Sequence, residues 1–138
     1  MADRFEDQVV VITGGGRGIG RATAIEFGAE GATLLLGGRR MDALQTAAQE
    51  VLGAGGKAAE IVHCDVAKDD DLKALIGKAI SHFGRIDVLV NNAGVVAGGR
   101  RDEIGADDVE RMTTVNVWAP IRLAQLALPH MREAKSGH

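Results

Sequence analysis

Three glycines near the N-terminus stand at a spacing that suits phosphate binding. The apolar run from Val9 to Ile12 leads into Thr13-Gly14-x-x-x-Gly18-x-Gly20. Glycine adopts positive φ freely and lets phosphate oxygens approach the backbone N–H groups at the start of a helix. We therefore predict a turn that holds a dinucleotide pyrophosphate, with a purely structural glycine-rich connection as the alternative. The candidate binding residues are Gly14, Gly16, Arg17, Gly18, Ile19 and Gly20.

Two other phosphate-binding patterns do not fit this segment. The Gly-x-Gly-x-x-Gly register fails because Ile19 and Arg21 stand where its last glycine is needed. The Walker A pattern fails because Arg21-Ala22 replaces its Lys-Ser/Thr pair. The spacing of this turn therefore differs from that of both general motifs.

A second phosphate contact is predicted from two arginines that follow the apolar run Leu34-Leu35-Leu36. At this place in a dinucleotide-binding fold, a carboxylate binds the ribose hydroxyl of NAD, whereas an arginine accommodates the 2′-phosphate of NADP. Gly38 stands in the carboxylate's place, Arg39-Arg40 follow it, and Arg17 can approach the same phosphate. Guanidinium groups bind phosphate through charge-assisted, often bidentate hydrogen bonds. We therefore expect NADP rather than NAD as cofactor, with Arg39 among the binding residues; a solvated pair of loop arginines is the alternative.

Polar residues also follow two further apolar runs. Asp65 comes directly after Cys64, and Asn91-Asn92-Ala93-Gly94 comes directly after Val88-Leu89-Val90. Ligands of open α/β sheets bind outside the carboxyl ends of the strands, which is where these residues would lie. The alternatives are a turn or capping carboxylate for Asp65 and a simple turn for the Asn-Gly segment. Asn116 lies within an otherwise apolar helix, where a buried amide must find partners, either a neighbouring backbone group or a water.

These motifs, in this order, resemble those of the common type of the short-chain dehydrogenase/reductase family, from about Gln8 onward. Within the family, the pattern resembles that of NADP-dependent members of the 3-oxoacyl-acyl carrier protein reductase kind. The resemblance implies that Asp65 binds the adenine amino group, with the backbone of Val66 beside it. It implies that Asn116 holds a water in a proton relay to an active-site lysine. It also implies that the segment passing under the nicotinamide ribose consists of Asn91, Asn92, Ala93 and Gly94.

The resemblance also implies residues that this sequence does not contain. The family's active site is a serine followed by Tyr-x-x-x-Lys, beyond the next strand, and this chain has no tyrosine. We therefore expect one dinucleotide-binding domain over residues 1–138 that corresponds to the N-terminal half of such an enzyme. The implied activity of the parent protein is NADP(H)-dependent hydride transfer to or from a small carbonyl or alcohol substrate. A non-catalytic nucleotide-binding half-domain is the alternative.

The elements that position these residues alternate between strands and helices. Continuous apolar runs predict strands buried on both faces, and apolar residues at helical spacing predict helices. Short turns between them predict a Rossmann-type, doubly wound parallel sheet, and the resemblance gives the strand order 3-2-1-4, without the C-terminal strands of the full fold. The expected strands span residues 8–13, 33–36, 57–64 and 87–90. The expected helices span 18–27, 41–52, 69–83 and 106–133, the last interrupted near Pro120 and Pro129.

Composition narrows the class of protein further. The net charge of −3 is mild and of the wrong sign for a nucleic-acid surface. No apolar run reaches the length of a membrane span or resembles a signal peptide, so no membrane contact is expected. The single Cys64 excludes an internal disulfide and fits the cytoplasm. No metal site is expected, because strand alternation points His63 and Cys64 to opposite faces.

Self-association is the last expectation. With the order 3-2-1-4, the strand over residues 87–90 would be an open edge with unpaired backbone groups. The helix over residues 106–133 would expose an apolar face, and the resemblance places this helix at a subunit interface. We therefore expect a homo-oligomer. The apolar residues of that face are Ile121, Leu123, Leu126 and Leu128.

Overall fold

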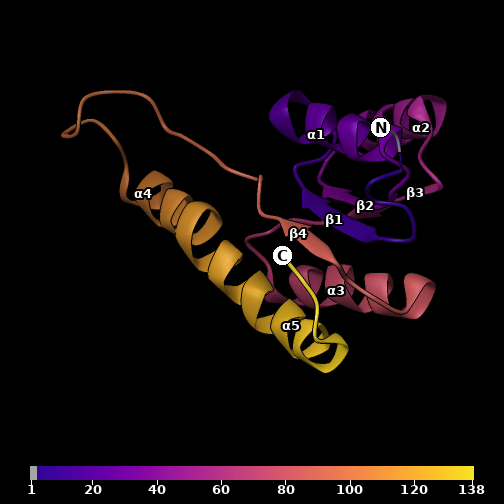
Figure 1. The fold of residues 1–138 in the computed structure, drawn as a ribbon. Helices are drawn as coiled ribbons and strands as arrows, with labels where there is room; N and C mark the ends of the chain where they lie inside the picture. Colours follow the sequence, from indigo (N-terminus) through magenta and orange to yellow (C-terminus); the bar gives the residue numbers. More distant parts are fainter. Residues whose placement is uncertain (1–2) are drawn as a thin grey trace.

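A four-stranded parallel sheet forms the centre of the molecule (Figure 1), in a computed structural model that describes residues 3–138. The strand order is β3-β2-β1-β4, so the predicted order 3-2-1-4 is confirmed. All three strand pairings are parallel, and Val11 of β1 lies beside Leu35 of β2 and Leu89 of β4. The strands are β1 (Val9–Thr13), β2 (Thr33–Gly38), β3 (Ala58–His63) and β4 (Val88–Val90).

Helices cover both faces of this sheet, as expected for a doubly wound fold (Figure 1). Alternation along β1 divides the core, because Val10 and Ile12 pack with α1 and α2 whereas Val11 packs with α3 and α5. The apolar runs are therefore buried on both faces, which is why they show no polar alternation. The helices of these two layers are α1 (Gly18–Ala29), α2 (Met41–Ala54), α3 (Asp69–Phe83) and α5 (Ala119–Ala134).

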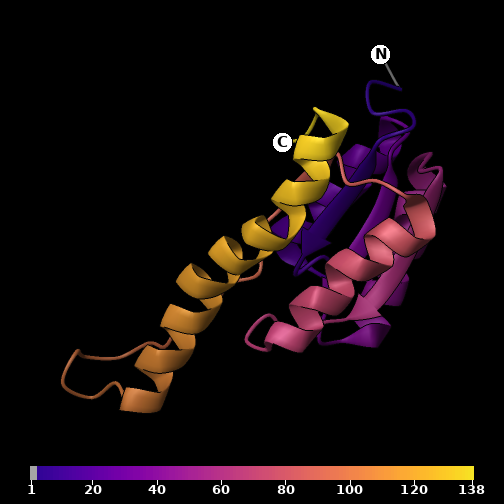
Figure 2. The same cartoon turned by 90° about the horizontal axis from the view of Figure 1, so that it is seen from below.

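The C-terminal helix is longer than the body it packs against, and its first part reaches beyond the sheet (Figures 1 and 2). It consists of α4 (Ala106–Thr113), one π-helical segment, η1 (Thr114–Trp118), and α5. The interruption predicted near Pro129 is wrong, because this residue lies inside α5. Its missing N–H would have bonded the carbonyl of Gln125 on the exposed side, where water can serve instead. Near Pro120 the irregularity does occur, as the π-helical segment that ends just before it.

The edge of the sheet at β4 is not as open as expected. The N–H of His138 donates to the carbonyl of Asp87 (2.8 Å), and the N–H of Leu89 donates to the carbonyl of His138 (3.0 Å). This is the hydrogen-bond pattern of a parallel pair. His138 therefore occupies the place of a fifth strand beside β4, and Figure 1 shows the C-terminus there.

The expected apolar face of the last helix is covered in part. Leu123 is buried against α3, which corrects the expectation that it is uncovered, and Leu126 is half-buried against the same cluster. Ile121 and Leu128 do remain exposed. Among residues 3–138, no helix is both long and apolar enough to cross a bilayer.

Candidate functional site

The glycine turn between β1 and α1 has the geometry of an anion site. Gly14 and Gly18 have φ values of +66° and +59°, the left-handed region that favours glycine. The N-cap residue of α1, Arg17, makes no side-chain capping bond, so the first N–H groups of the helix lack a partner of that kind. A Cβ built on Gly18 would meet nothing within 4 Å, so this part of the turn faces open space. The turn therefore fits a pyrophosphate held by backbone N–H groups.

Gly20 has a different role from Gly18. A Cβ on Gly20 would lie 2.2 Å from the carbonyl oxygen of Gly14, so only glycine allows α1 to approach the turn this closely. Gly16 likewise packs against the start of α2, where its Cβ would come within 3.2 Å of Ala43. The spacing of these glycines thus serves helix packing as well as ligand access.

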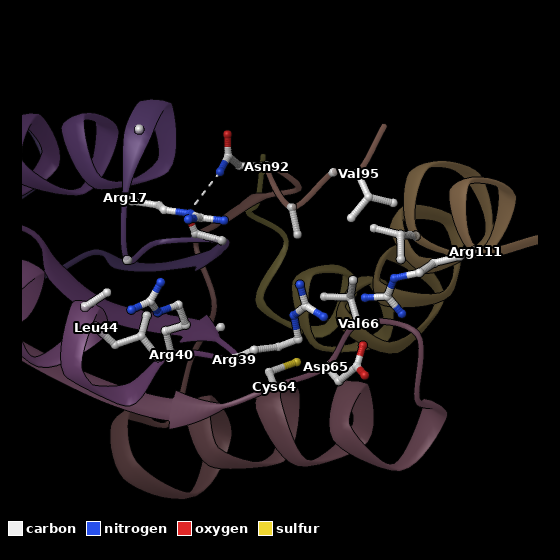
Figure 3. A pocket seen from close by; sticks show the side chains of 18 residues that line it. Arg17, Arg39, Arg40, Leu44, Cys64, Asp65, Val66, Asn92, Val95 and Arg111 are labelled. Atoms are coloured by element: carbon white, nitrogen blue, oxygen red, sulfur yellow. Dashed lines mark hydrogen bonds between the residues drawn. The ribbon is translucent and has the colours of Figure 1, made fainter. Parts of the chain in front are cut away.

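A groove of about 340 Å³ opens at the carboxyl edge of the sheet (Figure 3). Ten of the predicted cofactor-binding residues line it, and they come from the ends of all four strands. Three predicted ones do not line it: Ile19 is 79% exposed on another surface, Gly20 is buried behind Gly14, and Asn91 is exposed outside the groove. The predicted residues in the groove are Gly14, Gly16, Arg17, Gly18, Arg39, Asp65, Val66, Asn92, Ala93 and Gly94.

The hydroxyl of Thr13 holds in place the wall of the groove that Asn92 and Ala93 form. It accepts hydrogen bonds from the N–H groups of Asn92 (3.1 Å) and Ala93 (3.0 Å) and donates to the carbonyl of Val90 (3.5 Å). The amide Nδ2 of Asn92 donates to the carbonyl of Gly14 (3.2 Å), which joins the wall to the glycine turn. The sequence marks Thr13 only as a polar residue at the end of an apolar strand, and that is the signal for this role.

Positive charge gathers at the groove. Arg17 and Arg39 are exposed, and neither forms an ion pair with any of residues 3–138. Arg40 has only a long contact to Asp42, 3.7 Å between two exposed side chains. Sequence reasoning missed a fourth guanidinium, that of Arg111 on α4, which lies across the groove from the glycine turn (Figure 3). No signal in its neighbourhood singles it out.

Asp65 is half-buried at the end of β3, where its carboxylate takes part in a turn and also lines the groove. Its Oδ1 accepts a hydrogen bond from the N–H of Ala67 (3.0 Å), as the turn interpretation predicts. Its own N–H is bonded to Oδ2 of Asp71 (2.8 Å). The carboxylate also lines the groove, and no hydrogen bond to its Oδ2 is found among residues 3–138. The turn role and a ligand role are thus compatible.

Cys64 and His63 face different surroundings, as the strand alternation predicts. Cys64 is buried, and its burial raises the pKa of the thiol to about 12, so it stays protonated. His63 is exposed and lies 3.9 Å from the carboxylate of Asp71. Within residues 3–138, no group of His, Cys, Asp and Glu has the arrangement of a metal site.

Asn116 lies in the π-helical segment and is exposed, which corrects the expectation of a buried amide. Its Oδ1 accepts a hydrogen bond from the N–H of Val95 (2.9 Å), and its Nδ2 donates to the carbonyl of the same residue (2.7 Å). Val95 lines the groove. Asn116 therefore holds the segment after β4 in place through a backbone group that is remote in sequence. The predicted proton relay through Asn116 stays a prediction.

The parallel sheet, with a glycine turn at its carboxyl edge, defines a Rossmann-type α/β fold. The family described as short chain dehydrogenase matches residues 8–138. The chain belongs to this family.

Similar proteins support the same assignment. An uncharacterized oxidoreductase of Staphylococcus saprophyticus is 41% identical over 136 residues, which are 99% of this chain and 54% of that protein. A metagenomic short-chain oxidoreductase, solved in complex with NADP, matches with a TM-score of 0.92 and 38% identity over 97% of this chain and 61% of that chain. An NAD⁺-bound xylitol dehydrogenase matches with a TM-score of 0.91 and 30% identity over 97% and 52%. This chain thus spans about half to three fifths of the length of these proteins.

Proposed function

We propose that the groove binds a nicotinamide dinucleotide and prefers NADP(H) to NAD(H). The observation that carries this proposal is the glycine turn with Arg17 and Arg39 beside it, both without an ion-pair partner among residues 3–138, and with Gly38 in place of a carboxylate. A 2′-phosphate near two free guanidinium groups gains charge-assisted hydrogen bonds that a ribose hydroxyl does not. The solved relatives include both an NADP complex and an NAD⁺ complex, so the preference has to come from this chain's own residues.

In this proposal, each wall of the groove binds a different part of the dinucleotide. The N–H groups of the glycine turn bind the pyrophosphate, and the 2′-phosphate lies between Arg17 and Arg39. Asp65 accepts from the amino group of the base beside Val66, and Asn92, Ala93 and Gly94 border the nicotinamide ribose. Asn116 contributes by positioning Val95. The bound nicotinamide would supply or accept the hydride.

A binding titration tests the cofactor preference. The quantities to measure are the dissociation constants of NADPH and NADH, by isothermal titration at low and high salt. We expect NADPH to bind at least about tenfold more tightly, because one charge-assisted hydrogen bond contributes about 1.5–3 kcal/mol, and we expect the gap to narrow as salt screens it. Equal affinities would refute the preference, and no binding of either dinucleotide would refute the site.

For the parent protein we propose a cytoplasmic oxidoreductase that transfers hydride between this cofactor and a small carbonyl or alcohol substrate. Support comes from membership of the family and from the similar oxidoreductases. A substrate of the 3-oxoacyl kind is a narrower version that rests on the sequence pattern alone. The general acid expected of such an enzyme, a tyrosine, does not occur in these 138 residues. We therefore expect no carbonyl reduction by these residues alone with NADPH, and clear turnover on a panel of carbonyls would contradict this.

A non-catalytic nucleotide-binding module is the second candidate, because the glycine turn and the groove are sufficient for it. The two candidates differ in the intact mass of the native protein. A mass near 14.4 kDa supports the module, and roughly double that mass supports the enzyme.

We also propose that copies of the protein associate through the last helix. Val117, Ile121 and Leu128 are exposed there, about one helical turn or two apart. Apolar residues gathered on one exposed face are typical of an interface. Light scattering at tens of micromolar tests this, and a monodisperse monomer that unfolds cooperatively would refute it.

A further inference from the structure

Arg111 is the one residue of α4 that lines the groove. None of the α4 residues is buried, and Arg111 itself is half-buried in the last turn of this helix. Figure 3 shows its side chain directed from α4 toward Val66, on the side of the groove opposite the glycine turn. No ion pair or hydrogen bond joins its guanidinium to another side chain among residues 3–138. A partly buried guanidinium without a partner, aimed into a groove, is available to a ligand.

The surroundings of Arg111 differ from those of the other three arginines. Arg17, Arg39 and Arg40 lie at the glycine turn and the end of β2, where the phosphates are proposed to bind. Arg111 instead approaches from α4 the end of the groove at Asp65 and Val66, toward which the guanidinium of Arg39 also reaches (Figure 3). Val115, one helical turn after Arg111, lines the groove as well. A carboxylate repels phosphate, and the two valine side chains border this end with apolar atoms although both are almost fully buried. The chemistry at this end therefore fits a base and not an anion.

We infer that Arg111 stacks on the adenine ring of the bound dinucleotide and closes the groove over it from α4. A guanidinium is planar and delocalised, and it binds the face of an aromatic ring through a cation–π contact. Asp65 would meet the amino group at the edge of the ring, while Val66 and Val115 would contact its face. This inference rests on the proposed cofactor site and adds to it a base contact from an element that the cofactor motifs do not include.

This contact would link α4 to the rest of the molecule through the ligand. The segment 91–105 separates α4 from the sheet, and two side chains of the C-terminal helix contact it: Asn116 bonds Val95, and the N–H of Ala97 lies 3.3 Å from the sulfur of Met112. A base stacked under Arg111 would add a connection between α4 and the end of β3. Bound dinucleotide is therefore expected to protect the backbone amides of α4 from hydrogen exchange.

Substitutions that separate planarity from charge test the inference. We would titrate the protein with adenosine 5′-monophosphate, nicotinamide mononucleotide and NADPH. Arg111→Ala is expected to weaken binding of the adenosine ligand and of NADPH about fivefold, in keeping with a cation–π contact, and to leave the nicotinamide mononucleotide unchanged. Arg111→Lys keeps the charge and loses the plane, so it is expected to recover little. Arg101→Ala removes an exposed arginine that does not line the groove and serves as the control.

The alternatives give different results in the same experiment. Full recovery by Arg111→Lys, or a loss for NADPH alone, would identify a phosphate contact and overturn the stacking. Unchanged affinities in Arg111→Ala, with unmodified protein that binds normally, would overturn the inference and leave the proposed function intact. An unmodified protein that binds none of the three ligands would overturn both.

Discussion

The two sides of the groove are built in contrasting ways. On the side of the glycine turn, β1 and β2 are buried along nearly their whole length, and close backbone contacts at Gly16 and Gly20 fix the turn. On the other side, α4 has no buried residue and depends on a few contacts from Asn116, Met112 and its continuation into α5. Local opening costs least where few apolar contacts are lost. The side of the glycine turn is therefore formed before a ligand arrives, and the α4 side is the part that a ligand can order.

Gly20→Ala would break the rigid side and has the largest expected effect. Its Cβ would lie 2.2 Å from the Gly14 carbonyl oxygen and 2.5 Å from Nδ2 of Asn92, so the turn has to move. We expect a loss of about 3 kcal/mol in the free energy of unfolding, as for severe overpacking, measured by urea denaturation. Gly77→Ala is the matched control, because a Cβ there meets nothing within 4 Å and alanine favours the interior of α3 by about 0.5–1 kcal/mol. Equal stability of the two variants would show that the turn is not rigid.

Arg39→Ala tests the side of the glycine turn by its effect on the binding of NADPH and NADH. If the side of the glycine turn is preformed, the loss of one guanidinium should weaken NADPH by about tenfold or more and leave NADH nearly unchanged. Gly38→Asp should move the preference in the same direction, because it places a negative charge against the 2′-phosphate. The measurement is a pair of titrations for each variant. Equal losses for both cofactors in Arg39→Ala would show that Arg39 does not meet that phosphate.

Asn116→Ala tests the attachment of the α4 side. The variant removes both hydrogen bonds to Val95, with an expected cost of about 1 kcal/mol. Hydrogen exchange should accelerate at the amides of Val95 and Ala97 and stay unchanged in β1. Asn116→Asp keeps the acceptor for the Val95 N–H, so its exchange rates at Val95 and Ala97 should lie between those of the unmodified protein and of Asn116→Ala. Equal acceleration in β1 and in the segment would contradict the division into a rigid and a loose side.

The smallest expected effect on stability comes from the ion pair between Arg122 of α5 and Asp69 of α3. Arg122 and Lys73 lower the pKa of Asp69 to about 2 from an ordinary value of 3.8, chiefly through their hydrogen bonds to its carboxylate. Because the folded pKa is the lower one, the contribution to stability is present above about pH 4 and is lost as the pH falls toward 2. Thermal unfolding between pH 2 and 5 should therefore differ less between Asp69→Asn and the unmodified protein at the acid end. A constant difference across this range would exclude the pair.

The sequence predicts the rigid side better than the loose one, for a physical reason. Apolar runs such as the one in β1 have to be buried, and glycines at fixed spacing have to form a turn, so both are determined locally. Asn116 shows the opposite case, because its partner Val95 lies 21 positions away and no local pattern marks it. Arg111 resembles any exposed helical arginine until the fold brings it to the groove. The interruption predicted near Pro129 does not occur, since the cost of a proline inside a helix depends on whether water reaches the carbonyl that it leaves free.

The hydroxyl of Thr13 decides which donors the groove offers to an anion. By accepting from the N–H groups of Asn92 and Ala93, it takes two donors at the end of β4 out of competition. The backbone donors left for a phosphate are those at the uncapped start of α1, beside the guanidinium groups of Arg17 and Arg39. A dinucleotide bound as proposed would therefore place its pyrophosphate at the start of α1, because Thr13 occupies the donors at the end of β4.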